Sequence, residues 1–270
     1  MSIDHLRSHW GFSTTPFTRE LAPSMLFGSR AHKEAVARIS WLVSERALGL
    51  VTGEVGSGKS VAARAAVAEL DRSRHTVVYL ANPAVGTRGM YAEIVTALGG
   101  VPRYQKAALI AQATNLLAQE EDEWGRRVVV LIDEAHALDD ALEEIRLLMA
   151  AEMDSRAAFG CVLLGQPTLR KRIRLGTYAA LNQRVALRYV LEGMDREETG
   201  RYIAHHLKLA GRADVLFSDD AVALVHQVSR GLPRAVNNLA TQALVAAYVK
   251  RKSVVDESSA RMAAAEVDAE

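Results

Sequence analysis

Residues 48–60 read Leu-Gly-Leu-Val-Thr-Gly-Glu-Val-Gly-Ser-Gly-Lys-Ser, an apolar run that leads into a glycine-rich loop. The loop, residues 53–60, matches the pattern G-x-x-x-x-G-K-[ST] in full. Its glycines let the backbone curl so that successive N–H groups point inward, and the start of a following helix adds partial positive charge. We therefore expect a phosphate-binding loop between a buried strand at 48–52 and a helix that begins near Lys59.

This loop predicts a nucleoside triphosphate, ATP, and Mg²⁺ as its ligands. Lys59 would reach the β- and γ-phosphates, and the Ser60 hydroxyl would bind Mg²⁺. We expect contacts with the nucleotide from every residue of the loop and from the one after it: Gly53, Glu54, Val55, Gly56, Ser57, Gly58, Lys59, Ser60 and Val61.

A second motif, residues 128–134, reads Val-Val-Val-Leu-Ile-Asp-Glu. The apolar run is typical of a strand that is buried on both faces, and such a strand would deliver Asp133 to the edge of the sheet where ligands bind. There Asp133 would share the Mg²⁺ with Ser60, and Glu134 would orient and polarise the attacking water. The tetrapeptide Asp-Glu-Ala-His also resembles a helicase box, but 270 residues are too few for the two core domains of those helicases.

The pattern around these motifs alternates between strands and helices, which predicts an α/β fold with a parallel sheet and helices on both faces. We expect strands at 48–52, 76–81, 127–132, 159–164 and near 189–191, with helices at 31–47, 59–70, 90–98, 106–119 and 142–151. Beyond them only helical patterns follow, at 195–210, 218–228, 233–251 and within 257–265.

We therefore predict three parts of the chain. Residues 1–30 are expected to form an irregular arm, rich in aromatic and turn residues, that packs on the core. Residues 31–191 are expected to form the α/β nucleotide-binding domain, and 192–270 a small all-helical lid.

Three further polar positions are candidates for the site. Gln166 follows a predicted strand, where it would contact the γ-phosphate as a sensor or merely cap a turn. Arg184 lies before the predicted lid and could complete a neighbouring subunit's site, with Arg188 as the reserve; the alternative is a surface arginine paired with an acid. Arg234, after Pro233, would face the nucleotide from a helix start.

The order of these motifs resembles that of AAA+ ATPases of the ExeA type. The resemblance rests on the phosphate loop and Asp133-Glu134, and on four other segments: residues 10–17, 165–167, 183–184 and 231–238. The group includes general secretion pathway protein A and stand-alone ATPases encoded with transposases, akin to TniB and TnsC. The resemblance covers roughly residues 11–249 and implies the roles given above, with assembly into a ring or helical filament and ATP at subunit interfaces.

Within that group, the secretion proteins look like this ATPase joined to a membrane span and a peptidoglycan-binding part. The sequence shows neither, so we expect the transposition-associated branch. There the resemblance implies a regulator that assembles on double-stranded DNA, selects the target and recruits the transposase. Two alternatives stay open: an ATPase of an envelope or secretion assembly, and a slow ATP-binding regulatory switch.

Composition and charge set limits on these readings. Hydrophobic residues make up 49% and the net charge is +1, which fits a folded protein and neither predicts nor excludes nucleic acid. The longest stretch without charged residues, 235–249, is shorter than the ~20 residues that span a bilayer, and the single cysteine, Cys161, fits a reducing compartment. We expect a cytoplasmic protein without membrane insertion. His136 and Cys161 show no metal-ligand spacing, so we expect structural roles.

Several basic residues could contact DNA phosphates, or could simply lie on solvated faces. They are Arg170, Lys171, Arg172 and Arg174, then Lys250, Arg251 and Lys252, and Arg88, Arg103 and Lys106. No recognition motif accompanies them, so any binding would be to the backbone and tolerant of sequence.

Overall fold

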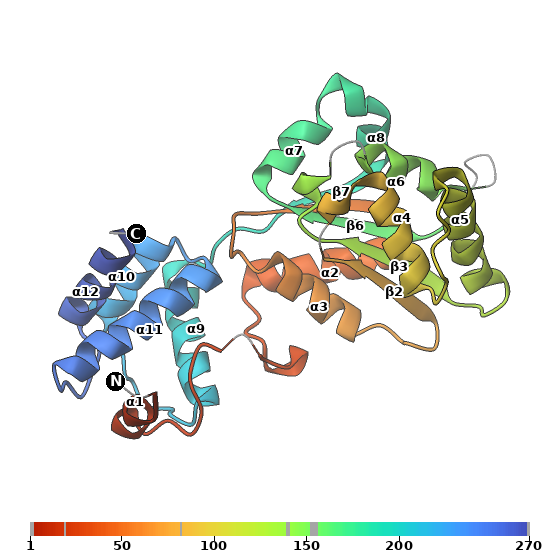
Figure 1. Ribbon diagram of the computed structural model, residues 1–270. Helices are drawn as coiled ribbons and strands as arrows, with labels where there is room; N and C mark the ends of the chain where they lie inside the picture. Colours follow the sequence, from red (N-terminus) through yellow and green to blue (C-terminus); the bar gives the residue numbers. More distant parts are fainter. Residues whose placement is uncertain (1–2, 19, 82, 139–140, 152–155, 269–270) are drawn as a thin grey trace. The chain divides into compact units, whose positions relative to one another are not determined.

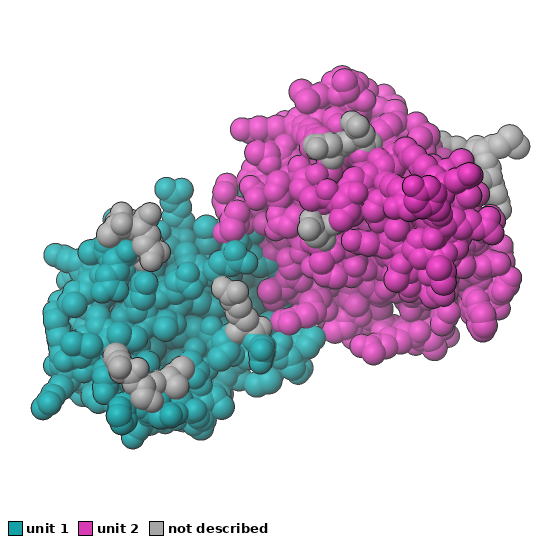
Figure 2. Space-filling view, viewed as in Figure 1, with its two compact units in different colours: residues 1–32, 56–58, 192–270 teal, residues 33–55, 59–191 magenta. Residues whose placement is uncertain are grey.

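The computed structural model describes residues 3–18, 20–81, 83–138, 141–151 and 156–268. The chain divides into two compact units, coloured separately in Figure 2. Unit 1 contains residues 1–32, 56–58 and 192–270, and unit 2 contains residues 33–55 and 59–191.

Unit 2 is built around a five-stranded sheet in which all neighbouring strands are parallel (Figure 1). In spatial order the strands are β2 (His75–Leu80), β3 (Arg127–Ile132), β6 (Gly160–Gly165), β1 (Leu48–Thr52) and β7 (Val185–Val190). The predicted α/β fold with a parallel sheet is confirmed. Because β6 lies between β1 and β3, the carboxyl ends of these three strands are neighbours at one edge of the sheet.

Helices cover both faces of this sheet (Figure 1). Leu48 and Leu50 of β1 point to one face, where they join a buried cluster with residues of α4 to α8. On the other face the α2 side chain of Leu42 lies so close to Gly49 that a Cβ there would be 1.9 Å from it. The helices of this unit are α2 (Arg30–Ser44), α3 (Lys59–Ala68), α4 (Gly86–Ala97), α5 (Lys106–Asp122), α6 (Ala141–Met149), α7 (Pro167–Ile173) and α8 (Ala179–Arg184).

The structure corrects several predicted elements of unit 2. The last strand is β7, longer and earlier than expected near 189–191, because it pairs with β1 from Leu48 onward. Helices α7 and α8 were not predicted. Short segments also appear: η2 (Pro83–Val85), η3 (Ala135–Ala137), η5 (Gly176–Tyr178), and the antiparallel pair β4 (Ala150–Ala151) and β5 (Arg156–Ala157).

Unit 1 is helical in its described part. Its helices are α1 (Ile3–Trp10), α9 (Arg196–Leu209), α10 (Asp219–Ser229), α11 (Pro233–Val249) and α12 (Glu257–Asp268), with a 3-10 segment, η1 (Pro23–Met25). Asp195 and Ser218 cap α9 and α10 by accepting hydrogen bonds from backbone N–H groups. Gly231, at φ +69°, is needed because a Cβ there would lie 1.9 Å from the carbonyl oxygen of Met194.

The amino-terminal arm differs from the prediction. Its beginning is the helix α1 rather than irregular chain. Trp10, Phe12 and Phe17 are buried in the core of unit 1. The backbone N–H of Ser13 donates to the carbonyl oxygen of Ala210 at 2.8 Å, which fixes the arm to the end of α9. These large aromatic side chains therefore fill the core of unit 1, to which its helices contribute many small alanine side chains.

Candidate nucleotide-binding site

The glycine-rich loop connects β1 to α3, as its sequence predicted. Gly56 and Gly58 have φ values of +80° and +97°, which side chains other than glycine rarely adopt. The N–H of Gly53 donates to the carbonyl oxygen of Gly165 at 3.2 Å. The loop is thus attached to the end of the neighbouring strand β6.

Lys59, the first residue of α3, is buried within this loop. Its Nζ donates to the carbonyl oxygens of Gly53 and Glu54, both at 2.9 Å. A buried ammonium group needs oxygen acceptors, and phosphate oxygens are stronger ones than carbonyl groups. The Ser57 hydroxyl is also buried and has no hydrogen-bond partner among the described residues. A buried cation and an unsatisfied hydroxyl in one loop fit a phosphate ligand.

Ser60 and Asp133 meet at the carboxyl ends of β1 and β3. The Ser60 hydroxyl donates to Asp133 Oδ2 at 2.5 Å, and Asp133 is only 5% exposed. One hydroxyl and one carboxylate at this distance are oxygen ligands of the kind that Mg²⁺ takes together with phosphates and water. The residues present therefore fit the ion that the sequence predicted.

Tyr79 also contacts Asp133, which the sequence did not predict. Its hydroxyl donates to the same Asp133 oxygen at 2.9 Å. Partial burial, followed by the hydrogen bond to Asp133 and the charges of Asp133 and Glu134, raises the pKa of Tyr79 to about 12. The phenol therefore remains a donor at neutral pH. The available signal was position: Tyr79 is the penultimate residue of β2, which ends at the same edge as β3.

Glu134 follows Asp133 in a turn with an unusual backbone. Its φ of 48° is in the left-handed region, which is uncommon for residues other than glycine. Its N–H donates to Asp133 Oδ1 at 2.8 Å, and its side chain is 53% exposed. A carboxylate that is exposed in this way can polarise a water molecule.

Gln166 lies at the amino end of α7, directly after β6. Its amide Nε2 contacts His136 Nε2 at 3.1 Å, and His136 Nδ1 lies 3.4 Å from Glu134 Oε2. The structure thus links Gln166 to Glu134 through His136, a residue for which we expected only a structural role. The available signal was its position in the Asp-Glu-Ala-His turn.

The three arginine candidates lie in different places. Arg184 ends α8 and is half-buried. Arg188, in the edge strand β7, donates to the carbonyl oxygens of Asn182 and Val185 at 2.6 and 3.1 Å. In unit 1 the backbone N–H of Arg234 donates to the Gly56 carbonyl oxygen at 3.2 Å.

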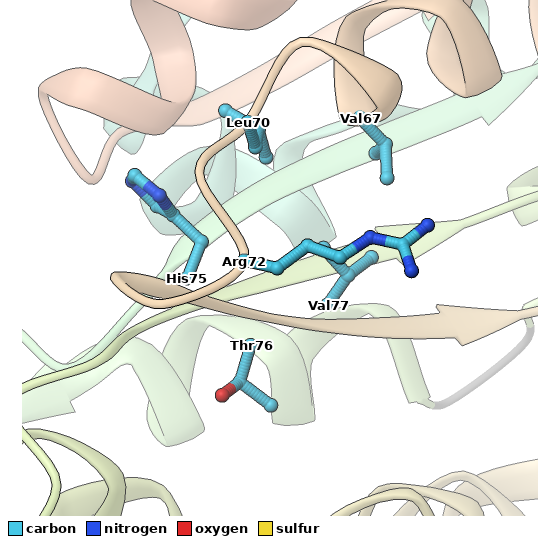
Figure 3. Close-up of a pocket in the computed structure, with 6 residues that line it drawn as sticks. All are labelled: Val67, Leu70, Arg72, His75, Thr76 and Val77. Carbon is cyan, nitrogen blue, oxygen red and sulfur yellow. The ribbon is translucent and has the colours of Figure 1, made fainter.

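A separate hollow of about 300 Å³ lies at the other end of β2 (Figure 3). It is lined by Val67, Leu70, Arg72, His75, Thr76 and Val77. Because His75 begins β2 and Tyr79 lies near its end, this hollow is at the opposite edge of the sheet from Asp133. None of the predicted site residues lines it.

Comparison with known proteins finds two similarities in sequence. The family model described as an AAA domain matches residues 42–173. The chain is also 32% identical, over 263 residues, to general secretion pathway protein A from Aeromonas hydrophila. That match covers 96% of this chain and 48% of the relative, so the chain spans about half of the relative's length. None of the helices in the described ranges is both long and apolar enough to cross a membrane.

Solved structures share the fold. Cdc6p from Pyrobaculum aerophilum matches with a TM-score of 0.68 and 15% identity, covering 88% of this chain and 67% of its own. The Aeropyrum pernix ORC1 protein in complex with DNA matches at 0.64 and 14%, covering 89% and 66%. The Thermotoga maritima RuvB Holliday junction branch migration motor matches at 0.56 and 18%, covering 86% and 67%. Residues 42–173 thus resemble an AAA domain, the chain is similar to part of general secretion pathway protein A, and its fold is shared with Cdc6p, ORC1 and RuvB.

Proposed function

We propose that this protein binds and hydrolyses ATP with the help of Mg²⁺. The single observation that carries the proposal is the contact of Ser60 Oγ with Asp133 Oδ2 at 2.5 Å, beside the buried ammonium group of Lys59. The match of residues 42–173, which include the loop and Asp133, to the model of an AAA domain supports nucleotide binding. Lys59 and the N–H groups of the loop would bind the phosphates, and Arg234 would contact them from the helical unit.

Each polar residue then has a role in cleavage. Ser60 and Asp133 would hold Mg²⁺, which when bound neutralises charge on the phosphate oxygens. Glu134 orients the attacking water and accepts its proton. Gln166 donates from its amide to the γ-phosphate and so distinguishes ATP from ADP.

We further propose that the protein assembles with copies of itself into a ring or helical filament. In this assembly Arg184 of one protomer reaches the ATP of its neighbour and stabilises the charge of the transition state. Arg184, the last residue of α8, is our first candidate for this role and Arg188 is the second.

The assembly is proposed to form on double-stranded DNA and to regulate transposition, by selecting the target and recruiting a transposase in the cytoplasm. ORC1 in complex with DNA and the RuvB branch migration motor share the fold, which supports a DNA partner. Arg88 and Lys171 are exposed cations that can contact phosphates. The Arg88 guanidinium also lies 5.5 Å from the ring centroid of Tyr104, which is 88% exposed.

A second candidate function is an ATPase of an envelope or secretion assembly. The specific observation in its favour is the 32% identity to general secretion pathway protein A. In that case the partner would be a component of the cell envelope rather than DNA. A regulatory switch that binds ATP and turns it over slowly would use the same residues.

The rate of phosphate release from Mg-ATP, with and without duplex DNA over a series of salt concentrations, separates these functions. We expect hydrolysis that DNA stimulates and that loses its stimulation as salt rises, because phosphate contacts release counterions. Lys59→Ala should abolish nucleotide binding and hydrolysis, whereas Lys208→Ala, which changes an exposed lysine of α9, should retain both.

Two other outcomes would favour the alternative functions. Hydrolysis that DNA leaves unchanged at every salt concentration would contradict the DNA-based function and favour the envelope assembly. Nucleotide binding by the wild-type protein with slow turnover under all conditions would favour the switch.

A further inference from the structure

We propose that His136 is a positioning residue that couples Gln166 to Glu134, so that the residue sensing the γ-phosphate and the residue polarising the water are oriented together. The inference rests on the ATPase function proposed above and deepens it. It concerns the regulation of hydrolysis after ATP has bound.

The His136 ring contacts the Gln166 side chain. The amide nitrogen of Gln166 lies 3.1 Å from His136 Nε2. An amide nitrogen can only donate, so the ring nitrogen that faces it must be an acceptor. A neutral imidazole with an acceptor at Nε2 carries its proton on Nδ1.

The proton on His136 Nδ1 points toward Glu134. His136 Nδ1 is buried and lies 3.4 Å from Glu134 Oε2, slightly beyond a well-formed hydrogen bond. The Nδ1–H group therefore faces a carboxylate, which is favourable. The opposite tautomer would place a lone pair against the Glu134 carboxylate and an N–H against the Gln166 amide. One tautomer of His136 therefore suits both neighbours: Nε2 accepts from Gln166, and Nδ1–H faces Glu134 without completing a hydrogen bond among the described residues.

The backbone of the turn keeps the His136 ring in this place. His136 belongs to η3, and its carbonyl oxygen accepts a hydrogen bond from Arg172 at 3.2 Å. Arg172 is a residue of α7, the helix that Gln166 precedes. His136 therefore joins the turn that carries Glu134 to Gln166 through its ring and to the last turn of α7 through its carbonyl oxygen.

This connection has a direct consequence for hydrolysis. A Gln166 amide that rotates to contact a phosphate changes the hydrogen bond that His136 Nε2 accepts. The imidazole and its Nδ1–H then reorient relative to Glu134. The carboxylate is aligned for the attacking water only when Gln166 has found the γ-phosphate.

Substitutions at position 136 test the coupling, because they should change kcat and leave KM unchanged. His136→Ala should lower kcat about tenfold, the effect on rate of losing a hydrogen bond to a charged group, and should leave KM and ATP-analogue binding close to wild type. His136→Asn places an amide donor where Nδ1 faces Glu134, and His136→Gln places an amide acceptor where Nε2 faces Gln166. Each should recover part of the lost kcat. His5→Ala, at an exposed histidine of α1, is the matched control and should match wild type.

A double-mutant cycle gives the decisive readout. If His136 acts through Gln166, the variant carrying both His136→Ala and Gln166→Ala should be no slower than the slower single variant. If the kcat of the double variant falls by the product of the two single effects, the residues act independently and the coupling is wrong. A wild-type kcat in His136→Ala would also contradict it. A wild-type protein that binds ATP without hydrolysing it would instead overturn the proposed ATPase function.

Discussion

At the carboxyl ends of β1, β3 and β6 the functional side chains bond to one another, whereas in the segment from α8 to β7 Arg188 bonds to the backbone around it. Ser60 and Tyr79 both donate to Asp133, and Gln166 meets Glu134 through His136. These contacts of the first region lie within one chain. In the second, Arg188 holds the edge strand to the end of α8, and the proposed role of Arg184 depends on another protomer. Local sequence motifs can specify the first kind of site, whereas the role that we propose for Arg184 would also require an assembly.

The largest effect is expected in the self-contained region. Glu134→Gln should lower the rate of phosphate release by about 10²–10⁴, because an amide cannot accept the proton of the attacking water. Binding of ATP should persist, since Lys59 and Ser60 are unchanged. Phosphate release and equilibrium binding of a fluorescent ATP analogue measure the two properties, with Glu45→Gln at an exposed position as the control. Hydrolysis at the wild-type rate in Glu134→Gln would assign the water to another residue.

A somewhat smaller effect is expected in the segment that depends on a neighbour. Arg184→Ala should lower hydrolysis by about 10²–10³, as the loss of one group that stabilises the transition state does, while ATP binding persists. Arg188→Ala is the matched control and should stay near the wild-type rate.

Mixing variants shows whether Arg184 acts between protomers. Protomers with Arg184→Ala have an intact phosphate loop, and protomers with Lys59→Ala have an intact Arg184. A mixture should therefore recover part of the activity. If the mixture stays inactive, Arg184 does not act in trans. If Arg188→Ala hydrolyses ATP more slowly than Arg184→Ala, then Arg188 is the arginine that stabilises the transition state.

The smallest effect is expected from Tyr79→Phe, which removes one hydrogen bond from Asp133. The rate should fall about two- to tenfold, the usual range for one hydrogen bond. Because the pKa of Tyr79 is raised to about 12, the phenol is protonated throughout the neutral and mildly alkaline range, and the loss should be equal at pH 7 and pH 9. Rates at both pH values over a range of Mg²⁺ concentrations test this.

Tyr91→Phe is the control for that experiment. Tyr91 also donates to a carboxylate, that of Glu144 at 3.0 Å, but between α4 and α6. A loss for Tyr79→Phe that differs strongly between the two pH values would mean that the Tyr79 phenol ionises in this range.

The sequence predicted the central strands well, because strands buried on both faces are continuous apolar runs. Residues 48–52 and 127–132 have the same bounds in the structure as β1 and β3. Strand β7 was misplaced because it lies at the edge of the sheet, where burial alternates and apolar runs are broken. Helix α8 is short and weakly patterned, and it packs against α6 and α7, which local sequence does not reveal.

The candidate site shows the same division. The phosphate loop and Asp133 each follow an apolar strand directly, so their positions at the ends of β1 and β3 could be predicted from the sequence. The contacts of Tyr79 and His136 depend on which strands are neighbours, and the strand order follows from long-range packing. For the same reason the sequence indicated that the aromatic residues of the amino-terminal arm pack on a domain, but not that Trp10 and Phe17 pack with the helices of unit 1.

The most direct test of the central claim is an experimental structure of the protein with Mg²⁺ and a non-hydrolysable ATP analogue. We expect the triphosphate within the loop from Gly53 to Ser60, with Lys59 Nζ turned from its carbonyl partners to the phosphates and the metal ion between Ser60 Oγ and Asp133. A nucleotide bound elsewhere, or a loop that stays empty at saturating analogue, would contradict the account.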